Sequence, residues 1–241
     1  MNDNSSGKRN QTLTSIIAII LLTVAIILVA TSCIKDDASL IQNDEETAKF
    51  KGIILTYSPK DGASVTEKDM EVYSELIVSR LRGKGYTDAI VINRGKSLLV
   101  EIPDVRELPQ AESLAQRPVT EITDASGNVL VNASHIKDAN TELGKLTEDS
   151  KGYKVTISFT DEGSLKFGQA TGEISTREAD NRIYINLDNI TVASPEVYGA
   201  VENGECIIEG NFSESEAKFL ATMIRASAIP FEMELTDNKT N

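Results

Sequence analysis

Ile53-Ile54-Leu55-Thr56-Tyr57 opens the folded part of the chain, and its β-branched and aromatic residues predict a strand. Turn-forming residues at 59–62 should end that strand. A helix should follow, because Thr66 and Asp69 have the spacing of a capping box and apolar residues then recur at helical intervals up to Leu81. The unit should close with a hairpin of two strands, over residues 89–93 and 97–102.

The C-terminal part repeats this order of elements. A predicted strand at 206–209 precedes a second capping box, formed by Ser213 and Glu216, then an apolar helix face and a last strand at 231–235. Two such units commonly form one antiparallel sheet with both helices on one face. We therefore predict an α+β fold with a ferredoxin-like split-βαβ base, built from residues 53–123 and 205–236 and followed by a tail at 237–241.

The residues between these units are too many for a loop and contain elements of their own, so we predict an inserted α+β head over residues 124–204. Val155, Ile157 and Phe159 alternate with polar residues, which is typical of a strand with one buried face. The head should also contain a helix at 164–171, a hairpin of 182–187 with 190–193 through Asp188-Asn189, and loops at 141–152 and 172–181.

An apolar run from Leu13 to Ala30 precedes the folded part and contains no charged residue. Its length suits a transmembrane helix, which we place at residues 13–32. Lys8 and Arg9 before the run favour a cytoplasmic tail at 1–12, and a linker at 33–52 would then lead to an extracytoplasmic domain. A cleaved secretory signal is the main alternative. Lipoprotein processing at Cys33, which follows three small residues, is a variant of it.

Composition and motifs argue against several classes of function. A net charge of −13 argues against a nucleic-acid partner. His135 is the only histidine and is more simply explained as structural than as catalytic. Cys206 and Cys33 do not have metal-ligand spacing, and no glycine-rich nucleotide-binding pattern occurs. We therefore predict no enzyme activity, no cofactor and no metal, with Cys206 as a small buried residue.

Several blocks of the sequence, taken in order, resemble the first large extracytoplasmic domain of SecD, the accessory membrane subunit of the Sec preprotein translocase. The resemblance runs from about Ile53 to Leu235. The longest blocks are K-V-T-I-S-F-T-D-E-G-S-L-K-F (154–167), I-N-L-D-N-I-T-V-A-S-P (185–195) and I-E-G-N-F-S-E-S-E-A-K-F-L-A-T-M-I-R-A-S-A-I-P (208–230). Shorter ones lie at 64–70, 99–103 and 135–139.

The resemblance implies a base made from both chain ends, an inserted head, and a role in late translocation with preproteins and Sec translocase subunits as partners. The family's further membrane spans have no counterpart here, so we do not expect proton-driven work from this chain by itself. Asn189 replaces the usual glycine, and Ala226-Ser227 replaces a Ser-Gly pair, which weakens the transfer of any specific contact at those positions.

Two places are candidates for partner binding. Exposed sheet edges and apolar clefts suit extended polypeptides, and the loop Pro195-Glu196-Val197-Tyr198 is the candidate surface patch, with a simple connection as the alternative. Arg225, late in the last helix, fits either a cation that complements the helix dipole or a partner contact near the membrane. The leading functional hypothesis is a SecD-like accessory of protein translocation. The alternative is a membrane-anchored or lipoprotein adaptor with a SecD-derived domain and no translocation role.

Overall fold

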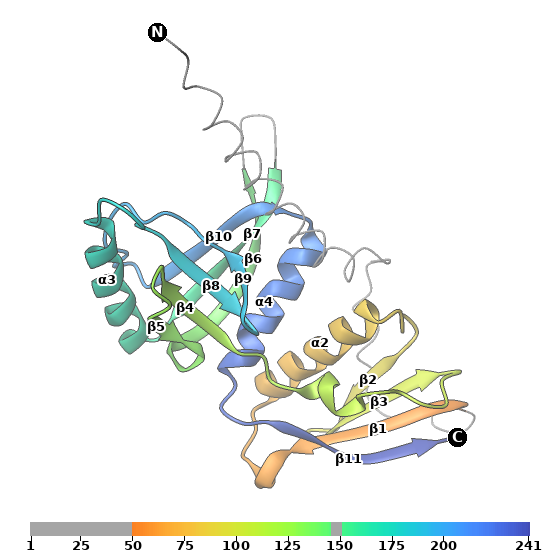
Figure 1. Cartoon of the computed structure of the whole chain (residues 1–241). Coiled ribbons are helices and arrows are strands. Elements are labelled where there is room, and N and C mark those ends of the chain that lie inside the picture. The colour runs from red at the N-terminus through yellow and green to blue at the C-terminus, as the bar shows by residue number, and fades with distance from the viewer. Residues whose placement is uncertain (1–49, 146–150) are drawn as a thin grey trace.

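The computed structural model describes residues 50–145 and 151–241, and in these residues the chain forms three β-sheets and three α-helices (Figure 1). The mixed α and β character predicted from the sequence is therefore confirmed. The helices are α2 (Glu67–Gly83), α3 (Asp161–Ser175) and α4 (Glu214–Ala228), and the short 3-10 helices are η2 (Lys60–Gly62), η3 (Ala111–Ala115) and η4 (Ala133–His135).

The first sheet, which we call sheet A, joins the two ends of the described chain. Its strand order is β11-β1-β3-β2, and every neighbouring pair is antiparallel. Tyr57 lies opposite Leu235, and Ile54 lies opposite Lys239. The prediction that the first and last strands share a sheet is thus confirmed. The strands are β1 (Gly52–Pro59), β2 (Ile90–Asn93), β3 (Leu98–Pro103) and β11 (Met233–Thr240).

Strand β11 continues into the residues predicted as a tail at 237–241. Thr240 still lies opposite Ile53, and the backbone N–H of Asn241 donates to the carbonyl of Gly52 at 3.0 Å. The sequence T-D-N-K-T shows no apolar alternation, but an edge strand needs only backbone hydrogen bonds on one side. The boundary at 236 was therefore placed too early.

Helix α2 covers one face of sheet A and begins as predicted. Thr66 accepts from the N–H of Asp69 at 3.2 Å, and the Asp69 carboxylate accepts from the N–H of Thr66 at 3.0 Å, which completes the capping box. Tyr57 and Tyr73 are fully buried and donate their hydroxyls to the carbonyls of Ala111 and Phe231. These bonds satisfy polar atoms inside an aliphatic core.

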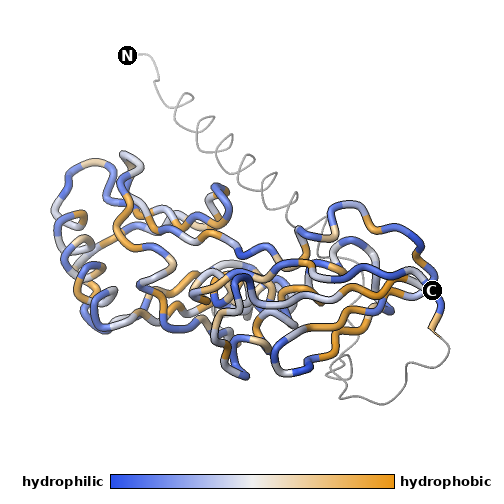
Figure 2. The backbone as a smooth tube through the Cα atoms, turned by 90° about the horizontal axis from the view of Figure 1, so that it is seen from below, coloured by the Kyte–Doolittle hydropathy of each residue, from blue (hydrophilic) through white to orange (hydrophobic). Residues whose placement is uncertain are grey.

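The head contains the other two sheets. Val155, Ile157 and Phe159 are buried, as the alternation predicted. Figure 2 colours the chain by residue hydropathy and shows hydrophobic and hydrophilic residues alternating along much of its length. Sheet B has the order β5-β4-β8-β9, with β4 (Thr120–Asp124), β5 (Val129–Asn132), β8 (Ile183–Leu187) and β9 (Ile190–Ala193). Sheet C has the order β10-β7-β6, with β6 (Ile136–Lys145), β7 (Lys151–Phe159) and β10 (Glu205–Phe212).

Strand β10 corrects the predicted base. We expected 206–209 in the base sheet, but Cys206 and Ile208 lie opposite Ile157 and Val155 in sheet C. Helix α4 then packs between α2 and strands β6 and β7 (Figure 1). The prediction that the strand at 206–209 belongs to the base sheet was therefore wrong. The local pattern specifies a strand, but not the sheet that the strand joins.

The loop predicted at 141–152 is also corrected, because β6 extends to Lys145 and β7 starts at Lys151. The predicted transmembrane helix at 13–32, the linker up to residue 49 and Cys33 lie outside the described residues. Within residues 50–145 and 151–241, no helix has the length and apolar character needed to cross a membrane.

Candidate functional site

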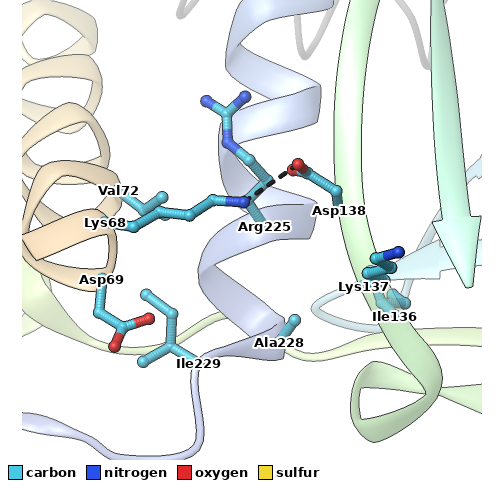
Figure 3. A pocket seen from close by; sticks show the side chains of 9 residues that line it. All are labelled: Lys68, Asp69, Val72, Ile136, Lys137, Asp138, Arg225, Ala228 and Ile229. Atoms are coloured by element: carbon cyan, nitrogen blue, oxygen red, sulfur yellow. Dashed lines mark hydrogen bonds and ion pairs between the residues drawn. The ribbon is translucent and has the colours of Figure 1, made fainter. Parts of the chain in front are cut away.

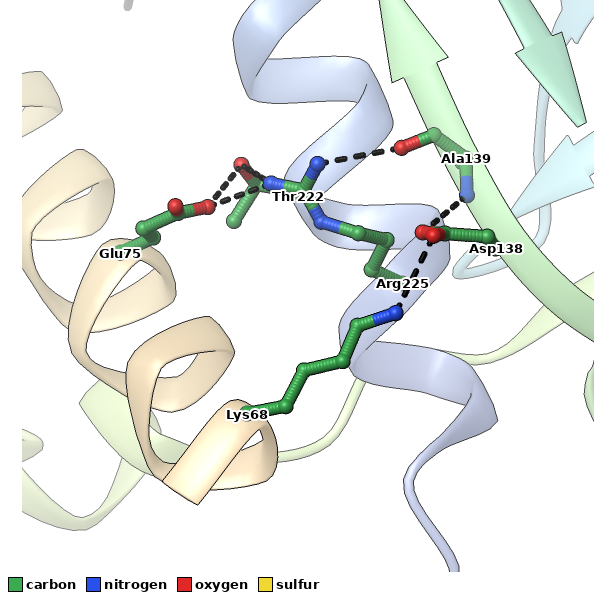
Figure 4. A network of polar contacts seen from close by, with 6 residues as sticks. All are labelled: Lys68, Glu75, Asp138, Ala139, Thr222 and Arg225. Atoms are coloured by element: carbon green, nitrogen blue, oxygen red, sulfur yellow. Dashed lines mark hydrogen bonds and ion pairs between the residues drawn. The ribbon is translucent and has the colours of Figure 1, made fainter. Parts of the chain in front are cut away.

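The junction between base and head is held by one arginine of α4. The Arg225 guanidinium donates from Nη1 to the carbonyl of Ala139 on β6 at 3.1 Å, and from Nη2 to the Glu75 carboxylate on α2 (Figure 4). Thr222, one turn earlier on α4, donates its hydroxyl to Glu75 at 3.2 Å and accepts from Arg225 at 3.1 Å. The Arg225 side chain therefore connects α4 to α2 and to strand β6 of the head.

A second link crosses the same junction nearer the start of α2. Lys68 Nζ lies 3.1 Å from Asp138 Oδ2, and the other Asp138 oxygen accepts from the N–H of Ala139 at 2.8 Å (Figure 4). The lysine is largely exposed, so solvent screens this pair and it stabilises the junction less than the Arg225 contacts do.

A small pocket of about 140 Å³ opens between these two links (Figure 3). Its wall is mixed, with charged side chains near the links and aliphatic ones toward the end of α4. It is too small for a drug-sized ligand, which needs about 300 Å³ or more. The lining residues are Lys68, Asp69, Val72, Ile136, Lys137, Asp138, Arg225, Ala228 and Ile229.

The two chain segments that cross between base and head are fastened to each other and to α2. Arg117, in the segment that leaves the base, donates to the carbonyl of Ile229 at 3.0 Å, in the segment that returns. Arg80 of α2 donates to the carbonyls of Leu114 at 2.9 Å and Gln116 at 2.6 Å. Burial lowers the pKa of Arg80 from its ordinary value, but an arginine stays charged at neutral pH. The crossing is thus a fixed part of the fold.

Arg225 was predicted either as a cation in the last helical turn or as a contact to a partner. It does lie in the last turn of α4, and every contact described for its guanidinium is internal to the chain. Within residues 50–145 and 151–241, its buried Nε has no hydrogen-bond partner. The partner contact stays a prediction.

The loop Pro195–Tyr198 lies beside the start of β8. The Pro195 carbonyl accepts from the N–H of Ile183 at 3.1 Å, and the N–H of Val197 donates to the carbonyl of Asn181 at 2.7 Å. Val197 is buried, whereas the Tyr198 side chain is 84 % exposed. The loop therefore continues the β8–β9 ladder and ends on an exposed aromatic ring.

Glu196 is held by its neighbours in this loop. Its carboxylate accepts from the Tyr198 hydroxyl and from the Arg182 guanidinium, and these two interactions, in that order, lower its pKa from the ordinary value. Glu196 is thus a positioned anion at the surface. Among the described contacts, none joins this loop to Arg225, so the two predicted places are separate.

His135 has a structural environment. Its Nδ1 accepts from the N–H of Asn132 at 3.2 Å, which fixes η4, and its Nε2 lies 2.9 Å from Lys166 Nζ and 3.6 Å from a Glu162 oxygen. The ring is therefore contacted on its Nδ1 side by the Asn132 N–H and on its Nε2 side by Lys166 and Glu162, all residues of the head.

Cys206 and the acidic side chains were the other candidates for chemistry. Burial raises the pKa of the Cys206 thiol to about 12, so it is not a thiolate at neutral pH. In the part of the chain that the structure describes, no three His, Cys, Asp or Glu side chains come together as metal ligands. The junction residues Glu75, Asp138 and Thr222 were not found from the sequence, because partners 70 to 150 positions apart leave no local pattern.

Comparison with known proteins identifies the relatives. The family model described as SecDF, P1 head subdomain, matches residues 111–231, half of the chain. The chain belongs to the SecDF family. The match starts at η3 and includes β10 and α4, so it extends to both segments that join head and base. The resemblance to SecD found in the sequence is confirmed.

The curated relatives are SecD subunits. The protein translocase subunit SecD of Acidaminococcus fermentans is 25 % identical over 98 % of this chain and 53 % of its own length. That of Dictyoglomus turgidum is 24 % identical over 78 % of this chain and 46 % of its own. The chain thus spans about half the length of these relatives. A crystal structure of SecDF, a translocon-associated membrane protein from Thermus thermophilus, is 19 % identical, with a TM-score of 0.47 over 97 % of this chain and 36 % of that one.

Proposed function

We propose that this chain is an accessory component of Sec-dependent protein translocation and that its described domain binds translocating polypeptide outside the membrane. The family match over residues 111–231 carries the proposal, and the SecD relatives are named as protein translocase subunits. The role is binding rather than catalysis. Sec translocase subunits are the proposed partners.

The architecture proposed for this role is a ferredoxin-like base with an inserted head. The strand order β11-β1-β3-β2 with antiparallel neighbours supports such a base. We propose to move the first head boundary from 124 to the start of β4, because β4 pairs with β8, and the second from 204 to the start of α4, because β10 pairs with β7. The proposed membrane arrangement is a single span at 13–32 with a cytoplasmic N-terminus, and lipidation at Cys33 is the alternative mode of anchoring.

The free edge of β9 is the proposed binding surface. In the described residues β9 pairs only with β8, and the ladder continues through Pro195–Val197. The strand I-T-V-A carries neither a charge nor a proline, the usual protections of an exposed edge. Its outer backbone groups are available for an added strand. Tyr198 presents an exposed ring at the end of this edge.

Strand addition suits a secretory polypeptide in transit. Such a chain is extended, and main-chain hydrogen bonds to an edge strand do not depend on its sequence. A four-residue edge offers few bonds, so the complex should be weak and release easily. We propose that Arg225 affects this binding only through the junction, since its described contacts are internal.

Site-specific photo-crosslinking in cells tests the proposal. Ile190 on β9 and Val129 on β5 are 48 % and 49 % exposed and lie on opposite edge strands of the same sheet, so they form a matched pair. A photo-reactive residue at Ile190 should crosslink a stalled secretory polypeptide, and one at Val129 should not. Equal crosslinking from both positions, or none from Ile190, would overturn the β9 site.

The same experiment separates the two functional hypotheses. The translocation role predicts Sec subunits or unfolded secretory chains among the crosslinked products. An adaptor without a translocation role predicts neither, and secretion would continue normally after deletion of the gene.

A further inference from the structure

Sheet A has apolar side chains on the face that is turned away from α2. Side chains alternate along a strand. Since Ile53 and Leu55 of β1 are buried on the α2 side, Ile54 points to the other side. The register then forms two rows on this outer face. One row is Ile54, Glu101 and Ile90, and the other is Thr56, Leu99 and Ile92.

These residues form a patch that is separate from the main core. We define the outer patch as Glu101 and the four aliphatic residues around it. None of the four belongs to the contiguous hydrophobic core, although Leu99 is only 9 % exposed. Figure 1 shows α2 on one side of sheet A and no described helix or strand on the other. The members of the outer patch are Ile54, Ile90, Ile92, Leu99 and Glu101.

Glu101 places in the patch a carboxylate oxygen that has no hydrogen-bond partner among the described residues. The residue is 6 % exposed, and its Oε1 has no hydrogen-bond partner within residues 50–145 and 151–241. Burial raises the pKa of Glu101, and the charge of Arg94 lowers it by a smaller amount. Lys239, two strands away, is paired with Asp237. A buried carboxylate oxygen without a hydrogen-bond partner destabilises a fold, so a cationic donor docked here would stabilise it.

We propose that the outer patch docks an amphipathic helix of a partner protein, whose aliphatic side chains surround one arginine or lysine that pairs with Glu101. A helix is the element that already covers the opposite face of this sheet, and a two-sided apolar sheet requires a second layer. A second copy docked face to face would bring two Glu101 carboxylates together. Residues 34–49 of this chain carry a net negative charge, so repulsion from Glu101 disfavours their binding to the outer patch.

This surface is distinct from the β9 edge, so the two proposals are tested independently. The full chain in lipid nanodiscs is titrated with a labelled synthetic helical peptide that has a leucine face with one central arginine. A second peptide has glutamate in place of that arginine. The arginine peptide should bind the unaltered chain at least tenfold more tightly than the glutamate peptide, a factor that corresponds to about 1.4 kcal/mol.

The variants test the role of the carboxylate. Glu101→Gln should reduce the preference for the arginine peptide by at least tenfold, and Glu101→Arg should reverse it. Glu234→Gln is the matched control, because this exposed glutamate of β11 lies outside the patch. It should leave the preference unchanged. Glu101→Gln is close in shape to the original residue, so circular dichroism should confirm that it folds.

Three results would overturn the proposal. The first is equal binding of both peptides, or binding of neither. The second is self-association of the chain that Leu99→Lys abolishes, which would assign the patch to a second copy. The third is tighter peptide binding after removal of residues 34–49, which would assign it to the chain's own segment.

Discussion

The base and the head hold their sheets together in different ways. In the base, β1 pairs with β11, and Ile53 lies opposite Thr240 near the far end of the chain. In the described part of the head, consecutive strands pair three times, as β4 with β5, β6 with β7 and β8 with β9. The base therefore depends on contacts that are distant in sequence, and most of the head's pairs are local.

This difference sets which region depends on the other. Distant contacts carry a larger loop-closure entropy, which is offset once the intervening chain is ordered. A folded head brings β11 close enough to pair with β1. The head should therefore hold its structure when the base is lost, and the base should not form when the head is disrupted.

Removing β11 should have the largest effect, and it tests whether the base and the head are stable independently of each other. A chain that ends at residue 232 loses the pairing partner of β1, so sheet A should lose its protection against hydrogen exchange while sheet B keeps it. Exchange measured by mass spectrometry checks this, with a chain that lacks only Asn241 as control. Simultaneous loss of protection in both sheets would mean that base and head are one cooperative unit.

Gly163→Ala tests the head at a single close contact. A Cβ at Gly163 would lie 2.4 Å from the carbonyl oxygen of His135, so helix α3 and η4 must move apart at a cost of about 1–3 kcal/mol. Gly172→Ala on the same helix is the matched control, since its Cβ would meet Ala200 at an ordinary 3.4 Å. That variant should be neutral or more stable, because alanine favours helices by about 0.5–1 kcal/mol.

Urea unfolding of the two glycine variants measures both effects. The head's local character predicts that Gly163→Ala lowers stability in the head and, through it, in the base. Equal stability of the two variants would contradict the close packing of α3 on η4.

Arg225→Met tests the connection between the two regions. The change removes the Arg225 donor from the Ala139 carbonyl and leaves the Glu75 carboxylate with the Thr222 hydroxyl, which should cost about 1–2 kcal/mol of unfolding free energy. Lys68→Met removes the exposed link and should cost less than about 1 kcal/mol. Chemical denaturation of both variants compares the links. A larger loss from Lys68→Met would reverse their assigned importance.

Glu101→Gln should give the smallest effect, and it should stabilise the base. Because burial raises the pKa of Glu101 above 4.5 in the folded state, the folded chain binds more protons than the unfolded chain as pH rises past this value. The original chain therefore loses stability between pH 4.5 and the raised pKa. The glutamine variant should not show this loss. Thermal unfolding of both chains at a series of pH values measures it, and parallel curves would contradict the shift.

Local patterns predicted much of the fold. The capping boxes at Thr66 and Ser213 are present because both partners lie within one helical turn. The turn at Asp188-Asn189 was predicted from residues that tolerate a left-handed backbone, and both adopt positive φ, at 49° and 65°. The sharing of a sheet by β1 and β11 followed from the symmetry of the two end units.

The errors arose where the local sequence pattern does not show which strand or side chain an element contacts. The second half of strand β6 was predicted as part of a loop at 141–152 because residues such as Thr141 and Glu142 are polar, yet β6 is an edge strand with few buried side chains. Strand β10 was assigned to the wrong sheet because its alternation fits either. The Arg225 contacts could not be read from the sequence, since each joins residues that only the tertiary fold brings together.

The bond from Arg117 to Ile229 has a mechanical consequence. Force applied to the head reaches the base through the two chain segments that cross between them. This hydrogen bond links the two segments near the end of α4. Tension on one segment is therefore shared by the other, so a polypeptide that pulls on the head loads β3 and β11 at once, on both sides of β1.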